Sequence, residues 1–132
     1  MTDEMIAALG KKRGVVQINF SCGFLNPEVL KSGEATRAAG DKVRVGPRAT
    51  LADVVKHINR VVDVAGIDAV GLGSDFDGID RAPADLDSVD KWPNLTRALL
   101  EEGYSAGDIR KIYGDNTLRL MSDVERVAKS MC

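Results

Sequence analysis

Residues 69–78, which read A-V-G-L-G-S-D-F-D-G, decide the expected fold. The segment begins as a run of small and apolar residues and ends in turn signals, a pattern that indicates a buried β-strand. Because alternate side chains of a strand share a face, one face is nearly bare and ends in a carboxylate. That face holds Ala69, Gly71, Gly73 and Asp75, and the bulkier face holds Val70, Leu72, Ser74 and Phe76. The pattern is typical of the wall of a site.

A second strand is expected at residues 15–20, V-V-Q-I-N-F, which also turns polar toward its C-terminal end. Between the two strands, Thr50 and Asp53 form a capping pair that opens a helix, and Gly66 ends it. The apolar residues of this helix recur at helical spacing, namely Leu51, Val54, Val55, Ile58, Val61, Val62 and Ala65. Strand, helix and strand in this order predict a βαβ unit with two parallel strands.

The flanking segments are expected to be helical or irregular. Residues 21–49 form the longest irregular stretch, with at most a short helix at 28–31 or 34–39, and loops of this length are usually functional. Helices are expected after Pro93, Ser105 and Asp115, and Gly103 and Gly114 are expected to end the first two. The first of these helices is expected to bury a stripe of Leu95, Leu99 and Leu100. On the last helix, apolar residues that belong to the core or to one helix face recur at helical spacing, namely Leu118, Met121, Val124, Val127 and Met131.

Composition narrows the class of protein. The chain has 132 residues and a formal net charge of −2, so residues 1–132 fit a single domain with no electrostatic case for binding nucleic acid. No apolar run reaches the roughly 20 residues that span a bilayer. Cys22 and Cys132 are expected to be free thiols, although a disulfide between them is the alternative. His57 is the only histidine, which excludes a His-rich metal site built from this chain alone and favours a structural role at the edge of a helix.

The two carboxylates at the end of the 69–78 strand are the strongest chemical signal. α/β folds place their chemistry at the carboxyl ends of parallel strands, so Asp75 is the candidate catalytic residue. The alternative is that Asp75 and Asp77 only cap the following turn, and Asp77 is expected to order that turn. Asn19 ends the other strand in the same manner, and its alternative role is to satisfy a loop backbone. The acidic connector at residues 79–92 lacks the register of an EF-hand and predicts a solvated loop.

Two families place D-x-D-G after an apolar strand. The haloacid-dehalogenase-like phosphatases do so, but here Gly78 is followed by Ile79 where that family has Thr. The second match is closer: G-S-D-F-D-G after A-G-I-D-A-V-G-L resembles the membrane (renal) dipeptidases, which are amidohydrolase-type metallopeptidases. The resemblance extends to G-V-V-Q-I-N-F, to K-W-P-N-L-T-R-A-L-L-E-E-G-Y-S and to D-I-R-K-I-Y-G-D-N-T-L-R-L, in the family's order. It covers all of the chain except residues 21–49.

The dipeptidase resemblance implies a fold, a reaction and site residues. The family fold is a (β/α)₈ barrel with two zinc ions at its C-terminal face, and the reaction is hydrolysis of dipeptides by a metal-bound water. Asp75 matches the aspartate of the last barrel strand, which binds and orients that water or takes its proton, and which would then pass the proton to the leaving amine. Asn19, Phe24 and Asp77 are the predicted substrate contacts, although Phe24 stands about where some members carry Tyr. The fold class is therefore α/β, as a partial TIM-type barrel with its last two parallel strands.

The sequence lacks the residues that hold the metal ions in this family. The family's His-x-Asp, bridging Glu and two further His ligands have no counterpart in this sequence, and a barrel of this kind needs about 250 residues. We therefore expect a C-terminal part of a dipeptidase that holds no metal and is inactive alone. Open strand edges predict aggregation, or pairing with the missing N-terminal barrel portion or a second copy. A non-catalytic α/β binding module is the alternative, and a cytoplasmic location is expected rather than secretion.

Overall fold

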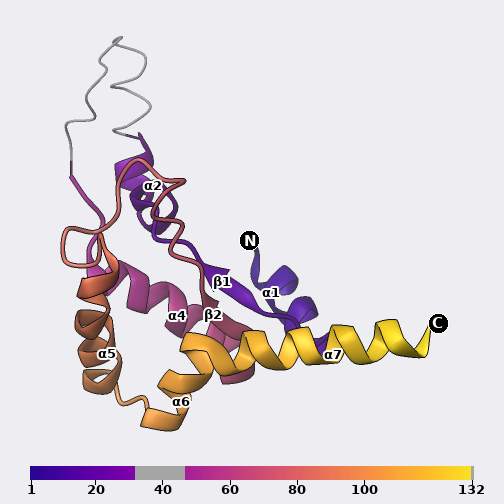
Figure 1. Cartoon of the computed structure of the whole chain (residues 1–132). Helices are drawn as coiled ribbons and strands as arrows, with labels where there is room; N and C mark the ends of the chain where they lie inside the picture. Colours follow the sequence, from indigo (N-terminus) through magenta and orange to yellow (C-terminus); the bar gives the residue numbers. More distant parts are fainter. Residues whose placement is uncertain (32–46, 132) are drawn as a thin grey trace.

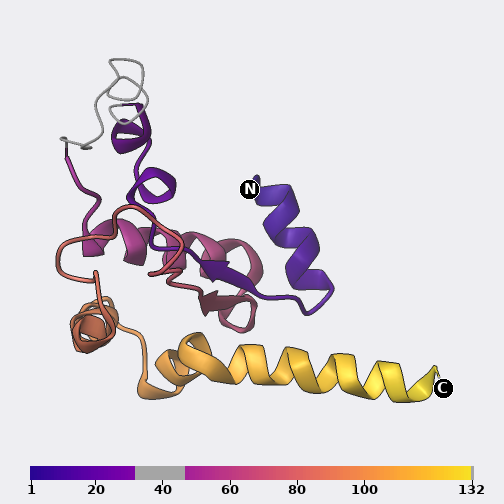
Figure 2. The same ribbon diagram turned by 45° about the horizontal axis from the view of Figure 1, so that its top comes forward.

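The computed structural model describes residues 1–31 and 47–131 and has an α/β arrangement (Figures 1 and 2). Two short strands lie at its centre, and helices surround them. The predictions for residues 34–39 and Cys132 lie outside the described residues. The elements are α1 (Asp3–Lys11), β1 (Val16–Ile18), α2 (Cys22–Leu25), α4 (Leu51–Ala65), the 3₁₀ turn η1 (Ile67–Ala69), β2 (Val70–Leu72), the 3₁₀ turn η2 (Val89–Lys91), α5 (Trp92–Glu101), α6 (Ala106–Arg110), the π-helical turn η3 (Lys111–Asp115) and α7 (Asn116–Ser130).

The strands β1 and β2 are parallel, as predicted, with Val16 opposite Val70 and Ile18 opposite Leu72. Both are shorter than expected, because regular pairing stops after three residues. Two further hydrogen bonds continue the contact, from the Gly73 amide to the Ile18 carbonyl and from the Phe20 amide to the Ser74 carbonyl. The described residues contain these two strands and no closed barrel. The strand ends, where Asn19 and Asp75 lie, are therefore held side by side.

The helix α4 carries the main apolar face and confirms the predicted pattern. Val54 and Ile58 are fully buried, and Val61 is 3% exposed. They join a core with Ile18 and Val70 from the strands. The predicted capping box is present, since the Thr50 hydroxyl accepts from the Asp53 amide and the Asp53 carboxylate accepts from the Thr50 amide at 2.8 Å. Burial of one helix face against the sheet thus fixes the βαβ unit.

The capping box makes α4 sensitive to acid. The Thr50 amide that donates to Asp53 is the main cause that lowers the pKa of this carboxyl below its usual value. An unfolded chain has an aspartate pKa of about 3.9, so the stabilisation is complete above about pH 4 and is lost as the pH falls through the folded pKa. We expect Asp53→Asn to be less stable than the wild type at neutral pH and to lose this difference in acid, as measured by urea denaturation. If the unfolding free energies of the two proteins fell in parallel with decreasing pH, the capping box would not be the source of the acid sensitivity.

The chain from α6 to α7 corrects one prediction. Gly114 does not end a helix, because α6, η3 and α7 follow one another without a break. A Cβ at Gly114 would have nothing within 4 Å, and its φ is not positive. The π-helical turn absorbs the change of direction instead, which sequence periodicity does not signal. The capping box of Ser105 and Asp108 at the start of α6 is present as predicted.

The helix α7 has the predicted apolar spacing, and its apolar stripe is a largely exposed helix face. α7 runs outward from the strands and its far end stands clear of the other described elements (Figures 1 and 2). Asn116 is its only buried residue. The five apolar residues of the stripe are 54–81% exposed, namely Leu118, Met121, Val124, Val127 and Met131. On α5, Leu95 and Leu99 are fully buried as predicted, but Leu100 is 53% exposed.

Parts of the predicted loops are more ordered than expected. Residues 21–49 begin with α2, which was not expected, and the helical turn at 27–31 confirms the short helix predicted at 28–31. In the acidic connector, Asp80, Asp85 and Asp90 are exposed, as predicted. Leu86 of the same connector is fully buried and fixes it to the core. The Cys22 amide donates to the Arg81 carbonyl at 2.9 Å and ties α2 to this connector. Cys22 itself is a buried free thiol.

Candidate functional site

Asp75 lies beyond the end of β2 in a left-handed backbone conformation, with φ at 60°. Strand alternation therefore does not set its direction, because that alternation holds only for extended backbone. Aspartate is among the few non-glycine residues that tolerate this region at moderate cost. Arg13 is the other non-glycine residue with positive φ in the described ranges. Such backbone conformations often occur at functional sites.

The Asp75 carboxylate is contacted from the neighbouring strand. Asn19 Nδ2 donates to Asp75 Oδ2 at 2.9 Å, and Asn19 Oδ1 accepts from the Ser21 amide at 2.7 Å. The Asn19 amide thus satisfies loop backbone, which was one of its expected roles, and also holds the Asp75 carboxylate, whereas its contact with substrate stays a prediction. Asp75 is exposed and Asn19 is half-buried. A solvent-accessible carboxylate with one oxygen held in place is suited to taking up and handing on a proton.

The turn after Asp75 is closed by backbone. The Gly78 amide donates to the Asp75 carbonyl at 2.9 Å. Asp77 is exposed, and its expected role in ordering this turn stays a prediction. Phe76 points back into the apolar side, where its ring lies 5.8 Å from that of Phe20 in an edge-on arrangement.

The bare face of β2 is filled by its neighbour and is not an empty wall. A Cβ at Gly73 would lie 3.1 Å from Gln17 Cβ, and one at Gly71 would lie 3.0 Å from Val15 Cγ1. Gln17 Nε2 also donates weakly, at 3.4 Å, to the hydroxyl of Thr117 at the start of α7. The glycines therefore let side chains from β1 approach the β2 backbone closely.

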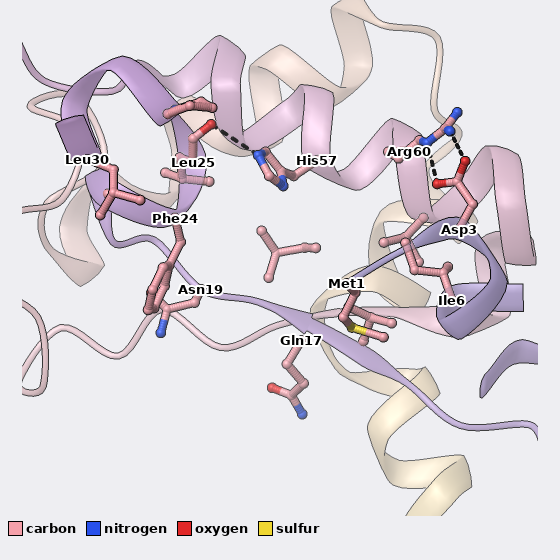
Figure 3. A pocket seen from close by; sticks show the side chains of 15 residues that line it. Met1, Asp3, Ile6, Gln17, Asn19, Phe24, Leu25, Leu30, His57 and Arg60 are labelled. Atoms are coloured by element: carbon pink, nitrogen blue, oxygen red, sulfur yellow. Dashed lines mark hydrogen bonds and ion pairs between the residues drawn. The ribbon is translucent and has the colours of Figure 1, made fainter. Parts of the chain in front are cut away.

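A cavity of about 640 Å³ opens on the other side of β1, between α1, α2 and α4 (Figure 3). Asn19 and Phe24 are among its lining residues, whereas Asp75 and Asp77 are not. Phe24 is 69% exposed. On the far side, Arg60 donates to Asp3 and holds α4 to α1. Of the predicted substrate residues, Asn19 thus lies between the catalytic candidate Asp75 and this cavity, Phe24 lines the cavity, and Asp77 does not.

His57 has a structural role, as predicted. It is half-buried on α4, and its Nε2 lies 3.0 Å from the Leu25 carbonyl (Figure 3). A ring nitrogen at that distance from a carbonyl oxygen carries the proton and donates it. The contact fastens α2 to α4 beside the cavity.

Asn116 is a structural residue that the sequence analysis missed. It is 3% exposed, and its Nδ2 donates to the carbonyls of Ile67 and Val70, both at 2.8 Å. Buried polar groups need such partners, so this side chain fixes the start of α7 to the beginning of β2. The sequence analysis expected one helix to end at Gly114 and the next to begin at Asp115. Asn116 was therefore not recognised as a buried residue inside a continuous helical run.

A row of aromatic side chains packs against Phe76, the residue next to Asp75. Phe20 is fully buried and lies 6.3 Å from Trp92, which in turn lies 5.3 Å from Tyr113 in an edge-on arrangement. The Tyr113 hydroxyl is 2.8 Å from that of Thr96, and burial raises the pKa of Tyr113. The row connects the end of β1 to α5 and η3.

The fold and the geometry of this site are those of an α/β protein. The exposed carboxylate at the carboxyl end of a parallel strand, held by the adjacent strand, lies where such folds bind their ligands. Within 1–31 and 47–131, no helix is both long and apolar enough to span a bilayer. Over the same ranges, no three His, Cys, Asp or Glu side chains come together in a group that could hold a metal ion.

Comparison with known proteins identifies the family. Residues 1–132 match the family described as membrane dipeptidase (peptidase family M19), and the chain belongs to it. It is 37% identical over 129 residues to the dipeptidase aclJ of Aspergillus oryzae and 34% identical over 128 residues to the dipeptidase tcpJ of Claviceps purpurea. These alignments cover 98% and 97% of this chain but 27% and 26% of the relatives, so the chain spans about a quarter of their length.

Solved structures agree with this assignment. A metallo peptidase from Rhodobacter sphaeroides, solved with a phosphinate mimic of the dipeptide L-Ala-D-Ala, superposes with a TM-score of 0.74 at 30% identity. The match covers 92% of this chain and 30% of that structure. The probable dipeptidase PvdM from Pseudomonas aeruginosa superposes with a TM-score of 0.73 at 24% identity over 90% of this chain and 39% of its own, which supports the fold alone.

Proposed function

We propose that this chain supplies the Asp75 edge of a dipeptidase active site. The observation that carries the proposal is the 2.9 Å hydrogen bond between Asn19 and Asp75 at the adjoining ends of two parallel strands, in a chain of the M19 family. The substrate would be a dipeptide, in line with the L-Ala-D-Ala mimic bound by the Rhodobacter sphaeroides relative. Of the functions expected from the sequence, family membership favours this one over a phosphatase or a binding module.

In this proposal Asp75 moves a proton during hydrolysis of the peptide bond. Its exposed carboxylate takes a proton as water attacks the carbonyl carbon and gives it to the nitrogen of the leaving amine when the bond between carbon and nitrogen breaks. General acid–base transfer of this kind contributes typically 10²–10⁴-fold to a rate. Asn19 keeps Oδ2 in place throughout, because it donates to the carboxylate and receives its own support from the Ser21 amide.

The family is one of metallopeptidases, yet the described residues do not fit a metal. They offer no group of donor side chains of the required kind, so we assign no step through zinc to this chain. In our proposal the two zinc ions and the rest of a (β/α)₈ barrel come from protein outside residues 1–132. A second copy of these residues would cover the open strand edges but has the same donors and would add no metal ligands. The expected cytoplasmic location stays a prediction.

Activity should therefore depend on completing the fold. We expect the 132-residue chain alone to bind zinc at far below one ion per chain and to leave L-Ala-D-Ala intact. A hybrid in which this chain replaces the matched segment of the Rhodobacter sphaeroides metallo peptidase should bind zinc and hydrolyse the dipeptide. Metal analysis and a dipeptide assay on both proteins test this. Stoichiometric zinc and hydrolysis by the isolated chain would overturn the view that the donors lie elsewhere.

A further inference from the structure

We propose that Asn19 and Gly78 are positioning residues for the Asp75 carboxylate, one by a hydrogen bond and the other by the space it leaves. The inference rests on the proposed function, since it assigns a task to two neighbours of the proton-transfer group. In this proposal Asn19 acts on the reaction through Asp75 and not through contact with substrate. Gly78 has no functional group, so its contribution is its lack of a side chain.

The orientation of the Asn19 amide is fixed by its two partners. The Ser21 amide can only donate, so the atom of Asn19 that faces it, at 2.7 Å, is the oxygen Oδ1. The NH₂ group must then face Asp75, where it donates to Oδ2 at 2.9 Å. An ionised carboxylate only accepts hydrogen bonds, so the two requirements agree. The contact with the loop backbone thus orients the Asn19 amide so that its NH₂ group faces Asp75.

Gly78 is required for its size and not for its backbone freedom. Its φ is not positive, unlike those of Gly66 and Gly103, so an L-residue fits its backbone. A Cβ at Gly78, however, would overlap Asp75 Oδ1 and lie 3.0 Å from Asp75 Cγ. The carboxylate therefore lies folded over Gly78, inside the turn that the Gly78 amide and the Asp75 carbonyl close at 2.9 Å. Alanine would keep this backbone contact and displace only the carboxylate.

Each substitution separates positioning from structure. Asn19→Asp keeps an oxygen for the Ser21 amide but replaces the donor to Asp75 with a like charge. Gly78→Ala keeps the turn but fills the space under Oδ1. Gly114→Ala is the matched control, because a Cβ there meets nothing within 4 Å and so touches neither Asn19 nor Asp75. The side-chain amide resonances of Asn19 in the full chain report the contact directly.

The spectroscopic arm uses the 132-residue chain. We expect the Asn19 NH₂ signals of the wild type to lie away from those of Asp75→Asn, which loses the carboxylate. Gly78→Ala should move them toward the Asp75→Asn position, and Gly114→Ala should leave them in place. Signals that Gly78→Ala does not move, or that are equal in the wild type and Asp75→Asn, would overturn the proposal.

The kinetic arm uses the hybrid enzyme. A misplacement of about 1 Å can cost about 100-fold in rate, so we expect Gly78→Ala and Asn19→Asp each to lower kcat by about that factor with little change in KM. In an Asp75→Asn background neither should lower kcat further, because the group they position is gone. Equal losses with and without Asp75 would overturn the positioning role while the proposed function stands. If Asp75→Asn itself kept full activity, the proposed function would fail, and the spectra would still decide whether the carboxylate is held.

Discussion

Replacing Asp75 with asparagine in the hybrid dipeptidase should lower kcat by about 10²–10⁴-fold, the range that a positioned general acid or base contributes. Asparagine has the same shape and tolerates a φ of 60°, so the turn should persist. An amide cannot take a proton from water and pass it to an amine, so the loss should fall on kcat more than on KM. The measurement is steady-state hydrolysis of L-Ala-D-Ala over a range of substrate concentrations.

The matched control for this prediction is Asp85→Asn in the acidic connector. It makes the same change of charge on another exposed aspartate. The backbone carbonyl of Asp85 accepts a hydrogen bond from Asn94 Nδ2 at 2.9 Å, and the substitution leaves this bond in place. This variant should retain the kcat of the parent hybrid. If both substitutions reduced kcat equally, the effect would be one of net charge, and Asp75 would have no special role.

Replacing Phe20 with alanine should cost about 3–5 kcal/mol of unfolding free energy, as is typical when a buried Phe is truncated. Phe20 is fully buried and contacts both Phe76 and Trp92, so the cavity left behind would lie directly under the site. Domains are stable by only about 5–15 kcal/mol, so this loss would bring the chain close to unfolding. Urea denaturation followed by far-UV circular dichroism measures it.

Phe24→Ala provides the comparison, because the same truncation is made four residues further on at a side chain that is 69% exposed. Little surface is released from the core there, so the denaturation midpoint should hardly move. A Phe24 variant as unstable as the Phe20 variant would show that the loss does not arise from burial.

The βαβ unit could be predicted from the sequence because its signals are local. The spacing of Val54, Val55, Ile58 and Val61 identifies the buried face of α4, and the capping pair at Thr50 and Asp53 identifies its start. A helix joined to the next strand by a tight connection leaves only a parallel arrangement. The placement of Asp75 and Asn19 at adjacent strand ends followed from that arrangement.

Other features depend on contacts that a single sequence does not display. The left-handed conformation of Asp75 breaks the alternation from which its direction was inferred. The helical run continues past Gly114 through a π-helical turn. Asn116 secures the following helix to two carbonyls that are 46 and 49 residues away in the chain. The stripe of α7 has helical spacing, but spacing shows only that a face is apolar and not that a neighbour covers it.

The aromatic row described beneath the site also gives the molecule a built-in optical probe. Trp92 is the only tryptophan of the chain, and it reaches Phe76, the residue next to Asp75, through a single intervening ring. Any ligand that shifts the Phe20–Phe76 pair changes the surroundings of the one strong fluorophore. Emission from the unlabelled protein would thus report occupancy at the end of β2 without a dye or a reaction.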